Sequence, residues 1–261
     1  MEKKRIDVLL VNKGLADSRS KAQRLVMAGQ VRVNGQVVQK SSILFSDEDD
    51  ISVDTGSIFV SRGGEKLEAA LSAFKIDVNN FICADVGAST GGFTDCLIQN
   101  GAKKVYSIDV GKGILHWNLR NHEKVVVMEG VNARHVERLP DDIQLVTIDT
   151  SFISAKILLP VVRSWFQDDN GQVILLIKPQ FEAGRTEVSR GKGVIRDPDV
   201  HKRVLIDVLQ FAQEARYQIS GLIKSPLMGP KGNLEFLAWL EWPGQRKDPV
   251  GIFVEPLFLN K

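Results

Sequence analysis

Hydrophobic and polar positions follow two different patterns along the chain, and the change falls near residue 59. Beyond it, short apolar runs rich in β-branched residues cover 81–88, 103–110, 124–130, 143–152 and 171–179. Stretches with helical spacing separate or follow these runs, near 91–100, 114–121, 153–165 and 199–215. This alternation predicts an α/β domain with a doubly wound, mostly parallel sheet that is covered on both faces. The last apolar region, 219–242, predicts two strands that form a closing hairpin at the sheet edge.

The first sixty residues predict a smaller α+β domain. Ile6, Leu9 and Leu10 have helical spacing, and Gly14 suits the end of that helix. A second helix starts at a cap formed by Asp17 or Ser18, and Gly29 closes it. Its apolar face consists of three residues, Ala22, Leu25 and Val26. The alternating segment 30–38 with its Asn34-Gly35 pair then predicts a hairpin.

These patterns divide the chain into four parts. We expect a small α+β domain at 1–58, a linker at 59–63, an α/β domain at 64–245 and a C-terminal tail at 246–261. The linker belongs to the segment 57–63, which we also considered as a hinge between the two domains. The tail contains proline but also Phe253, Leu257 and Phe258, which are able to pack against a core.

Composition indicates the cellular compartment of the protein and excludes some classes of protein. Of 261 residues, 43% are hydrophobic and 25% charged, which is ordinary for globular domains. No apolar run approaches the roughly 18 residues of a membrane span, and the N-terminal residues do not resemble a secretory signal. The two cysteines, Cys83 and Cys96, lie in apolar surroundings, so we expect free thiols and a cytoplasmic protein. The cysteines and histidines have no metal-ligand spacing, so no metal is expected.

Charge is distributed unevenly, although the net charge is only +2. Residues 1–45 carry nine basic residues against three acidic ones, which favours a polyanionic partner for the first domain. The basic residues expected to contact RNA there are Lys4, Arg5, Arg19, Lys21 and Arg24. A basic face that is merely solvated is the alternative interpretation.

The segment from Asp85 to Phe93, "DVGASTGGF", predicts a cofactor turn between a strand and a helix. Its glycine spacing is neither the dinucleotide G-x-G-x-x-G nor a Walker motif. Asp109 ends the next strand, where a carboxylate can accept hydrogen bonds from ribose hydroxyls. An acidic residue before the turn and another after the second strand favour S-adenosylmethionine over NAD. The expected cofactor contacts are Asp85, Gly87, Ser89, Gly91, Gly92, Phe93, Asp109, Asn132 and Asp149, with Arg134 beside Asn132.

Purely structural roles are alternative interpretations for these residues. Gly91 and Gly92 suit helix packing equally well, and Asp109 suits a helix cap. Asn132 and Arg134 follow the third strand, where a turn is as good an interpretation as an adenine contact.

Four charged residues lie where an α/β fold of this kind carries its chemistry: Lys66, Asp149, Lys178 and Glu235. Asp149 ends the fourth strand and Lys178 ends the fifth, while Lys66 lies on a helix before the first strand and Glu235 within an apolar late strand. Charges inside such apolar runs are costly unless they are paired or functional. A structural Lys178–Glu235 ion pair is the alternative.

Six motifs in order, "VSRGGEKL", "DVGASTGGFTDCLIQNGAKKVYSIDVG", "DTSFIS", "LIKPQFE", "GKGVIRDPDVH" and "PKGNLEFL", resemble the TlyA (haemolysin A) family. The N-terminal "SRSKAQRLVMAGQVRVNG" likewise resembles the S4-type RNA-binding domain. The resemblance covers nearly the whole chain and implies an S4-type domain joined to a Rossmann-like, FtsJ-like methyltransferase domain. It implies S-adenosylmethionine-dependent 2′-O-methylation of cytidine in ribosomal RNA, with ribosomal RNA or ribosomal subunits as partners. The FtsJ-like Lys-Asp-Lys-Glu tetrad then falls on Lys66, Asp149, Lys178 and Glu235.

The chemistry of ribose methylation suits these residue types. Alignment of a hydroxyl with a methyl sulfonium contributes up to ~7–11 kcal/mol, and a general base adds about 10²–10⁴-fold. We expect Lys178 to be the base and Lys66 to position the ribose or a phosphate. Burial beside a second cation favours a neutral Lys178, whereas the anions Asp149 and Glu235 oppose it.

The segment 182–201 is long, charged and rich in glycine, which predicts a lid over the RNA. Its cations Arg185, Arg190, Lys192 and Arg196, together with Arg62, are further candidate RNA contacts. The rival hypotheses are a non-catalytic RNA-binding assembly factor, a membrane-active haemolysin and a base methyltransferase. The last is disfavoured because no catalytic cysteine and no Asn/Asp-Pro-Pro-Tyr motif occur.

Overall fold

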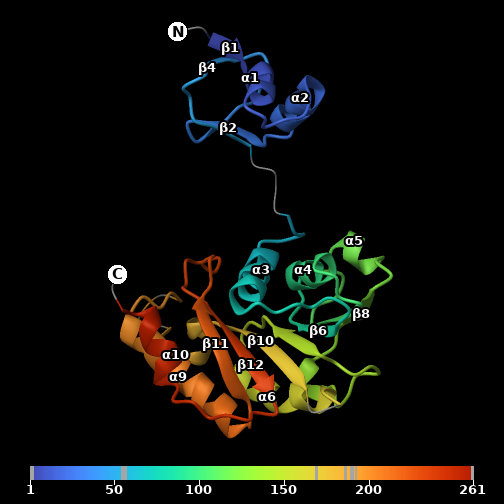
Figure 1. Ribbon diagram of the computed structural model, residues 1–261, viewed down its shortest axis with the longest axis vertical. Coiled ribbons are helices and arrows are strands. Elements are labelled where there is room, and N and C mark those ends of the chain that lie inside the picture. The colour runs from blue at the N-terminus through green and yellow to red at the C-terminus, as the bar shows by residue number, and fades with distance from the viewer. Residues whose placement is uncertain are drawn as a thin grey trace. The chain divides into compact units, whose positions relative to one another are not determined.

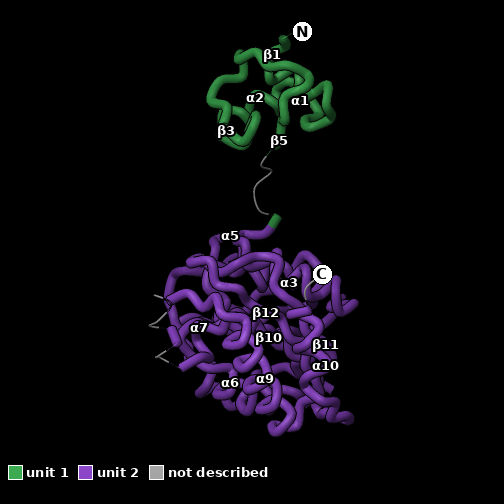
Figure 2. The backbone as a smooth tube through the Cα atoms, turned by 90° about the vertical axis from the view of Figure 1, so that its left-hand side faces the viewer, with its two compact units in different colours: residues 1–58 green, residues 59–261 purple. Residues whose placement is uncertain are grey.

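The computed structural model describes residues 3–53, 58–167, 170–184, 187–188, 191 and 193–259. The chain forms two compact units, residues 1–58 and residues 59–261 (Figure 2). Each unit has its own hydrophobic core, so each is described by itself.

The described residues of the first unit form a small α+β fold of two helices and two short sheets. Strand β1 pairs antiparallel with β4, and β2 lies between β3 and β5 in a second antiparallel sheet. Its elements are β1 (Lys3–Arg5), α1 (Ile6–Asn12), α2 (Arg19–Met27), β2 (Val31–Val33), β3 (Gln36–Val37), β4 (Leu44–Ser46) and β5 (Ile51–Val53).

Local sequence explains these elements. Ser18 is the N-cap of α2, where its hydroxyl accepts a hydrogen bond from the Lys21 amide at 3.3 Å. Asn34 and Gly35 have φ angles of 49° and 79°, the left-handed region that a two-residue hairpin turn requires. One face of each helix and one face of the hairpin form the core, through Ile6, Leu10, Ala22, Leu25, Val26, Val31 and Val33.

The second unit contains a seven-stranded sheet in the order β11-β12-β10-β9-β6-β7-β8 (Figure 1). The strands are β6 (Ile82–Val86), β7 (Lys104–Asp109), β8 (Val125–Glu129), β9 (Leu145–Ile148), β10 (Gly171–Ile177), β11 (Gln218–Lys224) and β12 (Phe236–Trp242). Strands β6 to β10 pair in parallel, whereas β12 is antiparallel to both of its neighbours. The predicted mostly parallel α/β sheet with a terminal hairpin is therefore confirmed. In the parallel part, the carboxyl ends of the strands share one edge.

Helices cover both faces of this sheet, as the alternation of apolar residues shows. In β10, Ile174 and Leu176 join a cluster with α3 and α4, while Val173, Leu175 and Ile177 join the opposite cluster with α6 and α9. The main helices are α3 (Gly63–Phe74), α4 (Gly92–Gln99), α5 (Trp117–Arg120), α6 (Ala155–Val162), α7 (Pro179–Glu182), α9 (Pro198–Glu214) and α10 (Gly251–Val254). Three short 3₁₀ turns complete the described part, η1 (Ala133–His135), η2 (Arg163–Trp165) and η3 (Glu255–Leu257).

The segments expected as linker and tail both pack on the second unit. The Phe59 ring is buried in the cluster beneath α3, and the Val60 amide donates to Asp95 of α4 at 2.7 Å. Near the other end, Val250 and Val254 are buried against α9 and β11. The first unit ends at residue 58, and residues 59–63 lie in the second unit, where Phe59 is buried and Val60 is half-buried.

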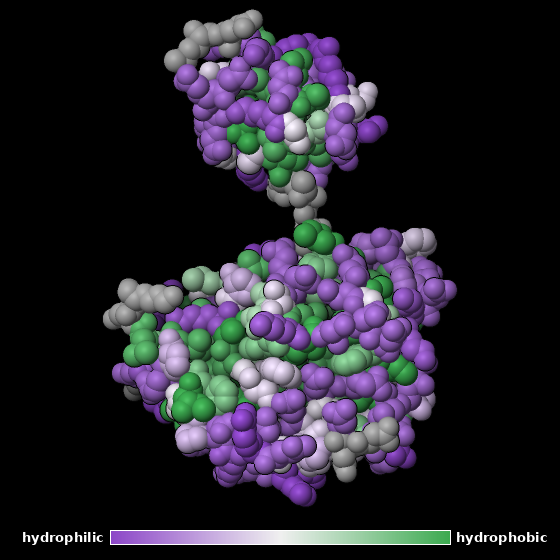
Figure 3. All heavy atoms as spheres, in the orientation of Figure 1, coloured by the Kyte–Doolittle hydropathy of each residue, from purple (hydrophilic) through white to green (hydrophobic). Residues whose placement is uncertain are grey.

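Hydrophilic residues dominate the visible surface of both units, with a hydrophobic patch on the second (Figure 3). Among the helices of the described residues, none has both the length and the apolar character that crossing a membrane requires. In the same part of the chain, His, Cys, Asp and Glu residues form no cluster of three that would hold a metal ion.

Candidate active site

The predicted cofactor turn lies at the carboxyl end of β6. Gly87 has a φ of +83°, and a Cβ there would lie 2.5 Å from the backbone oxygen of Asp149. Gly91 has a φ of +97°, and a Cβ there would collide with the Leu119 side chain. Only glycine combines these backbone conformations with such close approach, so the turn lies tightly against the end of β9.

Asp109 connects this turn to the end of β7. One carboxylate oxygen accepts a hydrogen bond from the Ser89 amide at 2.8 Å, and the other accepts one from the Gly111 amide at 2.7 Å. The Asp109 side chain therefore holds two loops at the same sheet edge, with a geometry that leaves oxygen lone pairs for further donors.

Asp85 lies beneath the turn rather than on its surface. Its carboxylate is fully buried and accepts hydrogen bonds from the hydroxyls of Thr94 at 2.7 Å and Thr147 at 3.0 Å. Burial raises the pKa of Asp85 to about 7, against the opposing effect of these hydrogen bonds. The carboxylate thus supports the turn from below.

A cavity of about 540 Å³ opens beside the turn. Its walls include five of the cofactor candidates, Gly87, Ser89, Gly92, Phe93 and Asp149, and the candidate RNA contact Arg62. Four other cofactor candidates, Asp85, Gly91, Asp109 and Asn132, are described but do not line it. Asn132 instead caps η1, where its side-chain oxygen accepts a hydrogen bond from the Arg134 amide.

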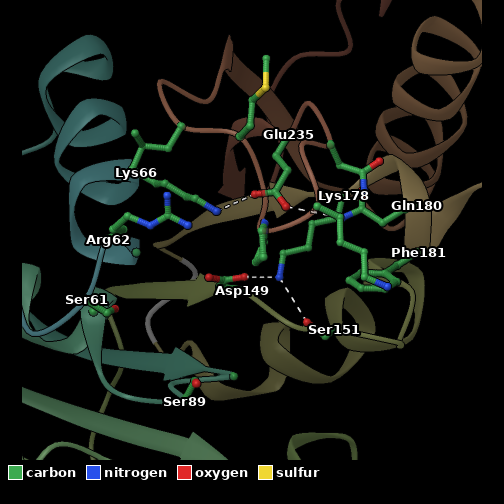
Figure 4. Close-up of a pocket in the computed structure, with 18 of the residues that line it drawn as sticks. Ser61, Arg62, Lys66, Ser89, Asp149, Ser151, Lys178, Gln180, Phe181 and Glu235 are labelled. Carbon is green, nitrogen blue, oxygen red and sulfur yellow. Dashed lines mark hydrogen bonds and ion pairs between the residues drawn. The ribbon is translucent and has the colours of Figure 1, made fainter. Parts of the chain in front are cut away.

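All four catalytic candidates line this cavity, and they form two ion pairs (Figure 4). Lys178 Nζ lies 2.5 Å from Asp149 Oδ1, and Lys66 Nζ lies 2.5 Å from Glu235 Oε2. Lys178 also donates to Ser151 Oγ at 3.4 Å. The pairing differs from the Lys178–Glu235 pair considered as the structural alternative, because each lysine reaches the carboxylate on its own side of the cavity.

Backbone position explains why these charges meet. Asp149 and Lys178 directly follow β9 and β10, which are neighbouring parallel strands, so their side chains emerge at the same sheet edge. Lys66 comes from the second turn of α3. Glu235 directly precedes β12, so it lies at the start of that strand and not inside it as the apolar pattern suggested.

Two aromatic residues in the cavity wall were missed by the sequence interpretation. The rings of Phe152 and Phe181 lie 4.8 Å apart, and Lys178 Nζ is 5.7 Å from the Phe181 ring centroid. Phe152 is 90% exposed and has a φ of +66°, a costly backbone conformation for a bulky residue. Their place in "DTSF" and "KPQF", three residues after Asp149 and Lys178, was the available signal.

The RNA candidates of the first unit are of two kinds. Lys4 pairs with Asp47 at 2.8 Å, and Arg5 and Arg19 both donate to the buried carboxylate of Asp7. Lys21 and Arg24 are exposed on α2. In the segment predicted to be a lid, Arg185, Arg190 and Lys192 lie outside the described residues, whereas Arg196 is exposed beside the buried Val194 and Ile195.

Comparison with known proteins identifies the class of this fold and site. Residues 59–242 match the FtsJ-like methyltransferase family, and residues 4–51 match the S4 domain. The chain is 43% identical, over 90% of its length and 89% of the relative, to the 16S/23S rRNA (cytidine-2′-O)-methyltransferase TlyA of Mycobacterium tuberculosis. It is also 43% identical, over 90% of its length and 98% of the relative, to Hemolysin A of Brachyspira hyodysenteriae.

A solved protein structure from Streptococcus thermophilus shares the architecture of both units. It has a TM-score of 0.73 and 40% identity, and the match covers 98% of this chain and 96% of that one. The chain therefore belongs to the FtsJ-like methyltransferase family, in the TlyA and haemolysin A group that carries an N-terminal S4 domain. The resemblance stated from the motifs is confirmed, and the protein is a methyltransferase.

Proposed function

We propose that this protein transfers the methyl group of S-adenosylmethionine to the 2′-hydroxyl of a cytidine in ribosomal RNA. The observation that carries the proposal is the convergence of Lys66, Asp149, Lys178 and Glu235 on one cavity beside the glycine turn. The Mycobacterium tuberculosis relative, a 16S/23S rRNA (cytidine-2′-O)-methyltransferase, supports this choice of substrate.

The residues at the turn fit S-adenosylmethionine. Gly87 packs so closely on Asp149 that a Cβ would lie 2.5 Å from its backbone oxygen, and both residues line the cavity that would take the cofactor. Ser89, Gly92 and Phe93 line the cavity on this side, and Asp109, which accepts a hydrogen bond from the Ser89 amide, would accept ribose hydroxyl hydrogens next to it. When bound, this cofactor supplies an electrophilic methyl group on a sulfonium.

The chain's own residues then prepare the hydroxyl. A neutral Lys178 donates one N–H to Ser151 and lies 2.5 Å from Asp149 Oδ1, which leaves its lone pair to accept the 2′-hydroxyl proton. Glu235 holds Lys66 on the opposite side, where the ammonium group positions the ribose or its phosphate. Asp149 lies between the glycine turn and Lys178, so it also fixes the distance between cofactor and base.

The first unit supports recognition of RNA. Its basic residues and S4 fold suit contacts to phosphates and to RNA shape rather than to base edges. Arg62, at the N-terminus of α3, adds a cation at the cavity itself.

The test is methyl transfer from labelled S-adenosylmethionine to unmodified ribosomal subunits and to free ribosomal RNA, with Lys178→Ala in parallel. Mass spectrometry then identifies the modified nucleoside. We expect 2′-O-methylcytidine from the wild-type protein and none from the variant, while affinity for S-adenosylmethionine remains nearly unchanged. Loss of that affinity in the variant would overturn the assignment of Lys178 as the base.

Transfer to no RNA, despite measurable binding of S-adenosylmethionine and RNA, would contradict the proposal and favour a non-catalytic assembly factor. Transfer to a base would contradict the proposal as well, because the proposed acceptor is the ribose 2′-hydroxyl.

A further inference from the structure

Gln180 is an uncharged polar residue of the cavity wall. It lies on α7, two residues after Lys178, and faces Glu235 (Figure 4). Its side-chain Nε2 donates a hydrogen bond to Glu235 Oε1 at 3.4 Å.

The Glu235 carboxylate is therefore held from two sides. Lys66 contacts Oε2 and Gln180 contacts Oε1, while only 1% of the Glu235 side chain is exposed. The backbone closes the remaining side, because a Cβ at Gly229 would lie 2.5 Å from Glu235 Oε1. A buried carboxylate needs such partners to remain charged in one place. Gln180 is the partner that links it to the segment carrying Lys178.

The orientation of the Gln180 amide points to a functional role. Its own oxygen, Oε1, is buried and has no hydrogen-bond partner in the described part of the chain. The reversed amide would place that oxygen against the Glu235 carboxylate and repel it. The side chain thus keeps an unpaired acceptor in order to donate to Glu235, an arrangement that stability alone does not favour.

We propose that Gln180 is a positioning residue for methyl transfer, which fixes Glu235 and through it the ammonium group of Lys66. The inference rests on the proposed function. Gln180 connects the two ion pairs of the cavity, because it follows Lys178 in sequence and contacts the partner of Lys66 in space. Without it, Glu235 and Lys66 rotate together, and the RNA ribose loses its fixed place relative to Lys178.

The experiment uses the full chain and the RNA substrate of the wild-type assay. Gln180→Leu removes the donor at similar volume, and Gln180→Glu places a second carboxylate against Glu235. We expect Gln180→Leu to lower kcat by at least about tenfold, the loss expected for a hydrogen bond to a charged group, with unchanged affinity for S-adenosylmethionine.

Gln180→Glu tests the positioning role through the pH dependence of the rate, which a purely structural role would not change. Two adjacent carboxylates share a proton, and the protonated acid donates to its neighbour as the amide does. The ratio of variant to wild-type rate should therefore rise as the pH falls from 8 to 6. A ratio that does not change with pH, or a wild-type kcat in Gln180→Leu, would overturn the proposal.

Gln172→Leu is the matched control, since Gln172 lies at the far end of β10 and accepts a hydrogen bond from Trp239 at 3.1 Å. It should lower the unfolding midpoint without lowering kcat. An equal loss of kcat in both variants would assign the effect to general destabilisation and overturn the positioning role. If the wild-type protein itself transfers no methyl group, the proposed function has failed, which this series distinguishes from failure of Gln180 alone.

Discussion

The two units contain contrasting clusters of charge. In the first unit, one buried carboxylate, Asp7, accepts hydrogen bonds from Arg5, Arg19 and Gln23 at 2.9–3.1 Å. In the second unit, two lysines and two carboxylates pair one to one within the cavity. Both clusters place cations next to anions, but they expose them differently.

The cationic side chains of the two clusters differ in their exposed fractions. The Arg5 and Arg19 side chains are 39% and 57% exposed, so solvent-borne phosphates can reach both guanidinium groups, although Asp7 accepts from Nε and Nη2 of Arg5 and from Nε of Arg19. Lys66 and Lys178 are only 11% and 12% exposed, so they act on whatever enters the cavity. We infer that the buried anion of the first unit holds surface cations where a polyanion can contact them, whereas the paired charges of the cavity serve the proposed methyl transfer.

The largest expected effect comes from Lys178→Arg. Arginine keeps the cation beside Asp149 but does not become neutral at any relevant pH, so it cannot accept a proton. We expect kcat to fall by about 10²–10⁴-fold, the contribution of a general base. Single-turnover methyl transfer at saturating RNA measures this loss.

Lys66→Arg is the comparison variant, because a positioning cation does not need to lose its proton. It should retain a much larger share of the rate than Lys178→Arg. If the two substitutions cost the same, the division of roles between base and positioning residue is wrong.

The buried pair of Lys66 and Glu235 gives the next effect. Glu235→Leu leaves Lys66 without its carboxylate and should lower the free energy of unfolding by about 3–5 kcal/mol. Adding Lys66→Met should restore most of this stability without restoring methyl transfer. Urea unfolding followed by the fluorescence of the four tryptophans, all in the second unit, measures the stability. A double variant that stays as unstable as Glu235→Leu would contradict the pairing.

Much of this architecture could be predicted from the sequence because it depends on local patterns. Alternating apolar runs specify the parallel strands, and Asn34-Gly35 specifies the hairpin of the first unit. The packing of residues 59–63 on the second unit was not foreseeable in this way. The burial of Phe59 under α3 depends on tertiary packing, which the local composition of "SIFVSRG" does not report.

The site could be predicted as a set of residues but not as a set of contacts. Charges at the ends of apolar strands indicate Asp149 and Lys178, since parallel strands end at one edge. Which lysine pairs with which carboxylate depends on side-chain paths across the cavity, and the Lys66–Glu235 pair joins residues 169 positions apart. Gln180 and Phe152 carry no charge, so their positions beside Lys178 and Asp149 gave only a weak signal.

Asp7→Asn is expected to change RNA affinity by a smaller amount, but the direction of the change distinguishes two hypotheses. The substitution makes the first unit more positive, so a purely electrostatic surface would bind RNA more tightly. If Asp7 orients Arg5 and Arg19, RNA binding should instead weaken, because the arginines lose their common anchor. Filter binding across a salt series measures the affinity. Asp47→Asn is the control, since it removes an exposed carboxylate paired with Lys4 and should not weaken binding.

The smallest expected effect is the acid sensitivity of the first unit. Hydrogen bonds from Arg5, followed by Gln23 and Arg19, hold the pKa of Asp7 well below its ordinary value of 3.8. Because the folded-state pKa is lowered, the stabilisation by Asp7 is present above about pH 4 and is lost as the pH falls further. Circular dichroism between pH 5 and 3 reports both units, whereas tryptophan fluorescence reports the second alone. The unfolding transition seen only by circular dichroism belongs to the first unit, and its stability should fall with acid in the wild-type protein and fall less in Asp7→Asn. Equal acid sensitivity of the two proteins would show that the Asp7 cluster contributes no stability.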